Sequence, residues 1–397
     1  MNLTFWTNIV SPHQAAYIRE LANVHRVTIV ADKRITADRV ALGWDTPDCG
    51  RAEVVIEPNR ASALKLAHAG DRSVHLLSGY RGCTLSGFVL REAVPDTRVG
   101  IIAEGCDFRG FPGSLRKIRC RWDVWRNRSR VDFALAMGFL GERWWRNCGL
   151  PRSRVFPFGY VVEKPGIREP QIPGGQSEVR VIYLGQFTGR KGVDVLLRAL
   201  ALCKQAPWQA DLVGSGPLEA MLRKMGSDLG IAGCVRFLKA QQQSEAMRMV
   251  AQSDLLVLPS HYDGWGAVVN EALMRGVPVI CTSACGASDL IRCPWLGSVV
   301  APGSTESLRR ALTGWITRGP RTAALSDKIR AWSRCIEGES VASYFLRVLD
   351  HVYEGGPRPV APWRIEADAE AAPEANPGLT CAGGRFGTDS FPAGLGK

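Results

Sequence analysis

Two acidic residues eight positions apart carry the strongest chemical signal in the sequence. Asp263 lies in a glycine-rich stretch, 260–266, that follows the apolar run Leu255–Leu258, and Glu271 comes early in the helical pattern after it. At this spacing both carboxylates can reach one site, one from the loop and one from the first turns of the helix. Carboxylates accept hydrogen bonds from vicinal hydroxyl groups, which a sugar or a ribose offers. A helix-capping aspartate beside a solvated glutamate is the ordinary alternative.

A second loop carries two adjacent cations. Gly185–Gly192 follows the apolar run Val179–Leu184 and ends in Arg190, Lys191 and a glycine before a helical pattern. The first N–H groups of a helix and the positive end of its dipole attract anions. With two added positive charges, this loop would suit a diphosphate. A plain turn with two solvated cations is the alternative.

A third loop, Gly214-Ser-Gly-Pro217, is a weaker signal of the same kind. It follows another short apolar run, and its glycines would let the backbone approach a ligand closely. Pro217 suits the first turn of the helix that comes next.

The elements that position these loops alternate between strand and helix, which predicts parallel sheets with helices on both faces. We therefore expect an α/β protein with two Rossmann-like domains that face each other across a cleft. In such sheets, ligands bind at the carboxyl ends of the strands. The expected strands are Leu3–Thr7, Val27–Val30, Val74–Leu77, Val99–Ala103, Phe133–Met137, Val155–Phe158, Val179–Leu184, Ala210–Val213, Leu255–Leu258 and Val277–Cys281. The expected helices are Gln14–Ala22, Leu85–Ala93, Leu140–Cys148, Val193–Cys203, Leu218–Leu229 and Val268–Met274.

Composition shifts mark the domain boundaries. We assign residues 1–165 to the first domain and 177–338 to the second, joined by a linker at 166–176 that is rich in proline and glycine. A helix follows at 339–355. The remaining residues, 356–397, are rich in proline, glycine, alanine and glutamate, which predicts a disordered tail.

The overall composition excludes several classes of protein. The chain has 397 residues, of which 46% are hydrophobic and 22% charged, as in ordinary globular proteins. It has no apolar run near the roughly 18 residues of a spanning helix, and its first residues lack a secretion signal. We therefore expect a cytoplasmic protein. The 12 cysteines are scattered without a C-x-x-C pair, so we expect neither a structural metal nor a disulfide framework.

The positive charge is concentrated in one segment, 109–154. It contains 12 basic residues against three acids, whereas the whole chain has a net charge of +12. Arginines alternate there with Trp122 and Trp125. Three interpretations remain open: a solvated basic helix with its tryptophans packed inward, a face that contacts anionic lipid, and a nucleic-acid site. No nucleic-acid-binding signature accompanies the charge, so we do not expect a nucleic-acid partner.

The stretch Val179–Arg292 resembles the donor domain of the retaining glycosyltransferases of family four, which have the GT-B fold. Three motifs carry the resemblance in the same order: GQFTGRKGVDVLLRAL, VGSGPLEAML and PSHYDGWGAVVNEALMRGVPVI. It is weaker over the first half of the chain. It returns in the helix at 340–353, which in this fold crosses back to the first domain.

The resemblance implies roles for individual residues. Lys191 and Arg190 would hold the diphosphate of a nucleotide sugar, Glu271 would hydrogen-bond the donor ribose, and Asp263 would contact hydroxyl groups of the transferred sugar. Such enzymes need no metal and no cofactor, because the nucleotide sugar is a co-substrate. Further donor-binding positions are Gly185, Gln186, Gly214, Gly216, Gly264, Trp265, Gly266 and Asn270.

The sequence also departs from the family's pattern. Many relatives have glutamate where Asp263 stands and arginine where Gln186 stands. The first loop lacks the usual glycine pair and contains His13 instead. We expect His13 and Glu104 to contact the acceptor, while a surface histidine and a solvated loop acid are the alternatives.

Together these features predict a retaining, metal-independent glycosyltransferase of the hexosyl type. Its acceptor would be a hydroxyl group on a lipid-linked or cell-surface polysaccharide intermediate, with segment 109–154 touching the cytoplasmic face of the membrane. Two alternatives remain: a nucleotide-sugar epimerase of the same fold, and a non-catalytic protein that binds membranes through its basic face. A nicotinamide dehydrogenase is disfavoured because the first loop has no G-x-G-x-x-G run.

Overall fold

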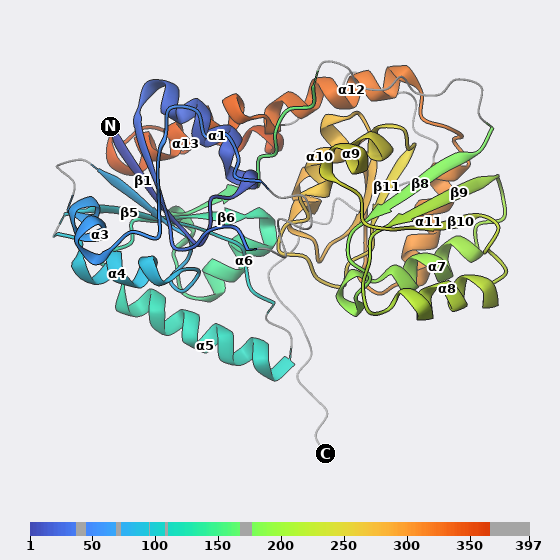
Figure 1. Ribbon diagram of the computed structural model, residues 1–397, viewed down its shortest axis with the longest axis horizontal. Helices are drawn as coiled ribbons and strands as arrows, with labels where there is room; N and C mark the ends of the chain where they lie inside the picture. Colours follow the sequence, from blue (N-terminus) through green and yellow to red (C-terminus); the bar gives the residue numbers. More distant parts are fainter. Residues whose placement is uncertain (37–44, 69–72, 95, 108–109, 167–176, 366–397) are drawn as a thin grey trace. The chain divides into compact units, whose positions relative to one another are not determined.

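The computed structural model describes residues 1–36, 45–68, 73–94, 96–107, 110–166 and 177–365. Its strands form two parallel sheets, one in each half of the chain (Figure 1). Most of the predicted linker, at 167–176, and the end of the predicted tail, at 366–397, lie outside the described residues.

The first sheet has the strand order β3-β2-β1-β4-β5-β6-β7. Its order reverses direction at β1, because β2 and β3 extend the sheet to one side and β4 to β7 extend it to the other. The strands are β1 (Asn2–Thr7), β2 (Arg26–Ala31), β3 (Glu53–Ile56), β4 (Val74–Leu77), β5 (Arg98–Ala103), β6 (Phe133–Met137) and β7 (Val155–Phe158). The helices are α1 (Pro12–Val24), α3 (Arg60–Ala67), α4 (Thr84–Glu92), α5 (Gly110–Arg126) and α6 (Gly138–Asn147), with a short 3-10 turn η1 (Arg152–Arg154).

Helices cover both faces of this sheet, and its central strands are buried on both sides. Within the core, the Trp6 indole donates to Nδ1 of His75 at 2.9 Å, and His75 is 1% exposed. Burial lowers the pKa of His75 to about 4, so the imidazole is neutral and can accept this hydrogen bond. Protonation of His75 would break this hydrogen bond, so His75 makes the first domain more stable at neutral than at acidic pH.

The second sheet has the strand order β10-β9-β8-β11-β12-β13. Helices α7, α8 and α11 share a buried cluster with one face of it, and α9, α10 and α12 pack on the other face. The strands are β8 (Val179–Leu184), β9 (Trp208–Val213), β10 (Val235–Leu238), β11 (Leu255–Leu258), β12 (Val279–Thr282) and β13 (Gly297–Val300). The helices are α7 (Val193–Ala201), α8 (Glu219–Asp228), α9 (Gln243–Ala251), α10 (Val268–Met274), α11 (Thr305–Ile316) and α12 (Ala323–Ser333), and the 3-10 turns are η2 (Gly189–Lys191), η3 (Gly286–Leu290) and η4 (Arg334–Ile336).

Helix α13 (Gly338–Tyr353) follows the second sheet in the chain but packs against the first. The Phe345 ring lies 6.1 Å from that of Phe5 in β1, and the Tyr344 hydroxyl donates to the carbonyl of Pro157 in β7 at 2.9 Å. The chain thus returns to its first sheet after completing the second.

The structure describes the first ten residues of the expected tail, 356–365, and two of them, Ala361 and Trp363, are buried. Trp363, in the 3-10 turn η5 (Pro362–Arg364), is 1% exposed, and its indole donates to Asp289 at 3.0 Å. The neighbouring Arg364 binds the same carboxylate, at 2.7 Å. Trp363 and Arg364 therefore attach this segment to the second sheet's side of the molecule, and the prediction of a disordered tail from residue 356 is wrong for the stretch up to Arg364.

The inward-packing interpretation of the tryptophans in α5 is wrong. Trp122 and Trp125 are 49% and 62% exposed, whereas Trp144 and Trp145 of α6 are buried. In the part of the chain that the structure describes, no helix is long and apolar enough to cross a membrane.

Candidate active site

The loop between β8 and α7 places both predicted cations. Phe187 is fully buried, and its N–H donates to the carbonyl of Ser215 at 2.9 Å, which ties this loop to the one after β9. Arg190 and Lys191 then lie in the turn η2, and Gly192, with φ of 65°, lets the chain enter α7. The two cations therefore stand directly before a helix N-terminus.

The glycines of the third loop allow two loops to touch. A Cβ on Gly214 would lie 1.9 Å from the carbonyl oxygen of Gly185, and one on Gly216 would lie 2.5 Å from that of Phe187. No side chain could be accommodated at such distances, so the loops after β8 and β9 meet through bare backbone. Gln186, between them, is exposed.

An ion pair joins the loop after β8 to the loop after β11. Nζ of Lys191 lies 2.6 Å from Oδ2 of Asp263, and the two side chains are 14% and 13% exposed. Arg190 donates to the carbonyl of Tyr262 at 2.9 Å, and its guanidinium lies 3.8 Å from the other oxygen of Asp263. The structure thus brings together three of the four residues predicted to be catalytic. Two cations and one carboxylate in a half-buried position can bind an anion and a hydroxyl group side by side.

The loop after β11 is fixed by hydrogen bonds that join it to α10 and to the residues after β7. Trp265 is 1% exposed, and its indole donates to Oδ1 of Asn270 at 2.8 Å. The amide nitrogen of Asn270 donates in turn to the backbone carbonyl of Tyr160 at 2.9 Å. Gly266, with φ of 92°, has no room for a Cβ, which would lie 2.8 Å from Sγ of Cys285. Two of the three predicted donor-binding side chains, Trp265 and Asn270, are therefore engaged within the protein, whereas the third, Gln186, is exposed.

Glu271, the fourth residue predicted to be catalytic, lies on α10 and is 8% exposed. Its Oε1 accepts a hydrogen bond from the side chain of Gln243, at the start of α9, at 2.8 Å. Burial raises the pKa of Glu271, although Arg275 and Gln243 act in the opposite direction. Its carboxylate faces α9 and has capacity for a further hydroxyl donor.

Glu104 comes from the end of β5 in the first sheet and reaches the same loop. It lies so close to Gly264 that a Cβ there would overlap its Oε2. The hydroxyl of Tyr160 donates to Oε1 of Glu104 at 2.5 Å, and the ring of His13 stacks on that of Tyr160 with centroids 5.0 Å apart. Burial raises the pKa of Glu104, and the nearby charge of Asp263 adds to that rise. Both predicted acceptor residues therefore belong to one cluster with the loop after β11.

Sequence reasoning missed three residues of this region: Tyr160, Tyr262 and Gln243. Tyr160 donates to Glu104 through its hydroxyl, and its backbone carbonyl accepts from the side chain of Asn270 on α10. The hydroxyl of Tyr262 donates to the carbonyl of Gly105. Tyr160 comes two residues after an apolar strand, so its position at the carboxyl end of β7 was a usable signal, whereas nothing in the sequence marks Gln243.

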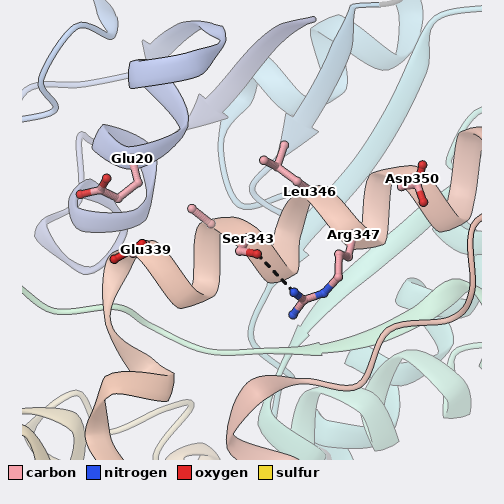
Figure 2. A pocket seen from close by; sticks show the side chains of 7 residues that line it. Glu20, Glu339, Ser343, Leu346, Arg347 and Asp350 are labelled. Carbon is pink, nitrogen blue, oxygen red and sulfur yellow. Dashed lines mark hydrogen bonds between the residues drawn. The ribbon is translucent and has the colours of Figure 1, made fainter.

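Other features do not compete for this role. In the described ranges, no group of three or more histidine, cysteine or acidic side chains is placed to hold a metal ion. A surface hollow of about 430 Å³ lies between α1 and α13, where Arg347 turns toward Ser343 (Figure 2). Its lining also includes Glu20, Glu339 and Asp350, so its net charge disfavours an anionic nucleotide.

Comparison with known proteins identifies the second half of the chain. Residues 169–332 match the family model described as glycosyl transferases group 1. This part of the chain is similar to the group 1 glycosyl transferases. Curated relatives include a D-inositol 3-phosphate glycosyltransferase of Rhodococcus jostii, 31% identical over 202 residues, and the lipopolysaccharide glucosyltransferase WaaG of Escherichia coli, 30% identical over 178 residues. The alignments cover 47% and 43% of this chain, and 44% of each relative, so the chain spans less than half of the length of either.

The group 1 assignment agrees with the fold. Anabaena HepE, solved in complex with UDP-glucose, superposes with a TM-score of 0.65 at 17% identity over 88% of this chain and 99% of that one. At this identity the likeness concerns architecture alone. The two parallel sheets with their flanking helices form the GT-B fold that the sequence motifs predict.

Proposed function

We propose that this protein transfers a sugar from a nucleotide-sugar donor to a hydroxyl group of an acceptor. The observation that supports the proposal is the contact of Lys191 and Arg190 with Asp263, at the carboxyl ends of β8 and β11. The cations would hold the donor diphosphate, and Asp263 would hydrogen-bond hydroxyls of the transferred sugar. Glu271 would bind the ribose, which agrees with its remaining acceptor capacity.

The transfer would retain the configuration of the sugar and need no metal. As the bond between the anomeric carbon and the phosphate oxygen breaks, negative charge grows on the leaving diphosphate. Lys191, Arg190 and the N-terminal N–H groups of α7 would stabilise that charge. The acceptor oxygen bonds to the anomeric carbon on the face that the phosphate leaves, and its proton passes to a phosphate oxygen of the departing nucleotide.

The acceptor would approach from the side of the first sheet. Glu104 reaches the loop of Asp263 from β5, and its carboxylate can accept a hydrogen bond from the acceptor hydroxyl while Tyr160 and His13 hold its surroundings. The names of the two curated relatives describe transfer to an inositol phosphate and to lipopolysaccharide. For this chain we propose a lipid-linked or polysaccharide intermediate, reached at the cytoplasmic face of a membrane through segment 109–154.

The test is calorimetric binding of UDP, GDP, ADP, CMP and TDP and their sugar conjugates to the purified full chain. We expect one diphosphate to bind selectively. Lys191→Ala should weaken it about 10-fold to 100-fold, the usual effect of losing a charge-assisted hydrogen bond. Lys204→Ala is the matched control, because Lys204 is exposed just beyond the other end of α7. Absence of binding at millimolar concentration would reject the donor site.

The stereochemistry and the metal requirement have a separate test. Once the donor is known, proton NMR of the glycosylated product, formed in the presence of a chelator, gives the anomeric configuration. We expect the configuration of the donor in the product at an undiminished rate. Inversion, or loss of activity with the chelator, would contradict the proposed mechanism.

A further inference from the structure

Helix α5 presents a line of large apolar side chains to solvent. Phe111, Leu115, Ile118, Trp122 and Trp125 are 76%, 51%, 64%, 49% and 62% exposed. Their spacing alternates between four and three residues, which places them on one side of the helix. These five residues are called the stripe below.

The opposite side of α5 attaches the helix to the first sheet. Val124 is buried in the core cluster that contains α4 and α6. Asp123 is 7% exposed and receives two hydrogen bonds of 2.7 Å from the guanidinium of Arg81. At about 100° per residue, Gly113, Cys120 and Val124 lie on the side away from the stripe. The helix is thus anchored with its apolar stripe outward.

The stripe is not ordinary surface. Across the described residues, 15 large apolar side chains are exposed, and five of them, including both exposed tryptophans and the exposed phenylalanine, belong to this one helix. Single exposed apolar residues are common in soluble proteins, whereas a continuous line of five marks an interaction surface.

Cations border the stripe on both sides. By the helical period, Arg119 and Arg126 lie along one edge and Arg121 along the other, and all three are exposed. The guanidinium of Arg126 lies 5.2 Å from the centre of the Trp122 ring. An amphipathic helix with aromatic residues in its apolar face and arginines along the edges has the composition of helices that lie in the headgroup layer of a membrane.

The acids of segment 109–154 do not neutralise these cations, because each is bound elsewhere. Asp123 pairs with Arg81, Asp132 accepts from the hydroxyl of Tyr353, and Glu142 pairs with Arg364. The arginines along the stripe are therefore exposed to solvent, whereas the three acids are paired with other groups of the protein. This arrangement complements an anionic surface.

An arginine-lined hollow lies beside the helix. Arg143, Arg146 and Arg152, with Asn147 and Leu150, surround a space of about 390 Å³ at the end of α6. No acid lines it. Planar guanidinium groups bind phosphate oxygens in pairs, so this hollow suits a phosphate group.

The hollow and α5 are neighbours. Cys120 of α5 packs against the buried cluster that contains Trp144 and Trp145 of α6 and Cys148, which follows α6. The apolar stripe and the arginine hollow therefore belong to adjacent elements of the first sheet's helical layer.

We propose that this face docks on an anionic phospholipid bilayer, with the stripe of α5 inserted at the boundary of headgroups and acyl chains and the arginine hollow holding a lipid phosphate. This rests on the membrane contact proposed above for segment 109–154 and specifies how it is made; docking itself uses none of the donor-site residues. A bilayer is favoured over a protein partner because a lipid surface explains both the apolar line and its flanking arginines together. It is favoured over a nucleic acid because the five apolar side chains would otherwise face a polar groove.

The test is co-sedimentation of the full chain with vesicles of phosphatidylcholine alone or with 30% phosphatidylglycerol. We expect at least tenfold stronger partitioning onto the anionic vesicles. Ile118→Ser with Trp122→Ser should lower that partitioning at least tenfold at every salt concentration. Arg146→Gln with Arg152→Gln should lower it several-fold in 0.1 M salt, and less at higher salt where all ionic attraction is screened.

Two matched measurements keep the result interpretable. Leu202→Ser with Leu229→Ser removes exposed apolar side chains from the second sheet's helices and should leave partitioning unchanged. Brominated lipid should quench tryptophan emission, and Trp122→Phe with Trp125→Phe should abolish the quenching without unfolding the chain. Equal partitioning of the stripe variant and the native chain, or binding of duplex DNA with no binding of vesicles, would overturn the proposal. Nucleotide calorimetry needs no lipid, so the donor site is judged separately.

Discussion

Removing the carboxylate of Asp263 should strengthen the binding of a nucleoside diphosphate while it abolishes sugar transfer. In the structure, Oδ2 of Asp263 lies 2.6 Å from Nζ of Lys191, the nitrogen that we expect to contact the diphosphate. A phosphate oxygen about 2.8 Å from that nitrogen, in another of its tetrahedral directions, would lie about 4.4 Å from the carboxylate oxygen. The carboxylate and the phosphate then share one cation and repel each other.

The size of the effect follows from that separation. Two unit charges about 4.4 Å apart repel by about 4 kcal/mol at an effective dielectric constant of about 20. Delocalisation of both charges and the partial exposure of the site, 13% for Asp263, reduce this figure. A residual effect of about 1 kcal/mol corresponds to roughly fivefold tighter binding for Asp263→Asn.

The assay is calorimetric titration of the diphosphate that the native chain selects, at fixed ionic strength. Asp211→Asn is the control, because Asp211 also pairs with a cation, Arg236 at 2.6 Å, but on the outer strands of the second sheet. We expect no change for the control and the opposite sign for Lys191→Ala. Weaker or unchanged binding by Asp263→Asn, with the control also unchanged, would refute the idea that carboxylate and phosphate compete for Lys191.

Three further substitutions test the site and the core. Tyr160→Phe removes a hydrogen bond that lowers the pKa of Glu104, so that pKa should rise and the acid limb of the kcat/KM profile should move to higher pH. His75→Gln should remove a pH dependence of stability. The pKa of His75 is about 4 in the fold and 6.5 in the unfolded chain, so the unfolded chain binds a proton more readily. The free energy of unfolding should therefore fall by about 2 kcal/mol between pH 7.5 and pH 5, which urea unfolding measures. Gly214→Ala should cost about 2 kcal/mol of stability and weaken diphosphate binding, because its Cβ would lie 1.9 Å from the carbonyl oxygen of Gly185.

Each of these three predictions can be contradicted by a specific result. For the tyrosine, an acid limb that stays in place while activity falls would show a packing role alone. For the histidine, its contribution to stability is fully present above pH 6.5 and is lost as the pH falls toward 4. If His75→Gln lost the same stability over this range, groups other than His75 would cause the loss. For the glycine, Gly189→Ala on the neighbouring loop is the matched control, since nothing lies within 4 Å of its Cβ. Equal effects of the two alanines would contradict the close approach of the loops.

The strand–helix rhythm was readable wherever a strand is buried on both faces. The apolar runs at 179–184 and 255–258 coincide with β8 and β11, which lie inside the second sheet. The strands that the sequence did not reveal, β3, β10 and β13, are edge strands of their sheets. Each has partly exposed residues, so it lacks the continuous apolar run that marks a central parallel strand.

The loops of the site were predictable, but their partners were not. Glycine, cation and carboxylate positions after β8, β9 and β11 follow from the rule that ligands lie at the carboxyl ends of parallel strands. The hydrogen bond from Tyr160 to Glu104 joins residues 56 positions apart, and that from Gln243 to Glu271 joins residues 28 apart. Such pairs depend on how separate elements pack, which a single sequence does not encode locally.

The end of the described chain decides where the protein can be shortened. The guanidinium of Arg364 lies between Glu142 of α6 and Asp289 of η3, and Asp289 is 4% exposed. A chain cut at 355 would remove Arg364 from between Glu142 and Asp289, leaving Asp289 only the longer contact with Arg292 at 3.7 Å, and would leave an empty space where Trp363 had packed. Residues up to 365 should therefore be kept when the protein is shortened for crystallisation. A boundary chosen from composition alone would yield a protein that lacks the link between α6, beside the first sheet, and η3, beside the second.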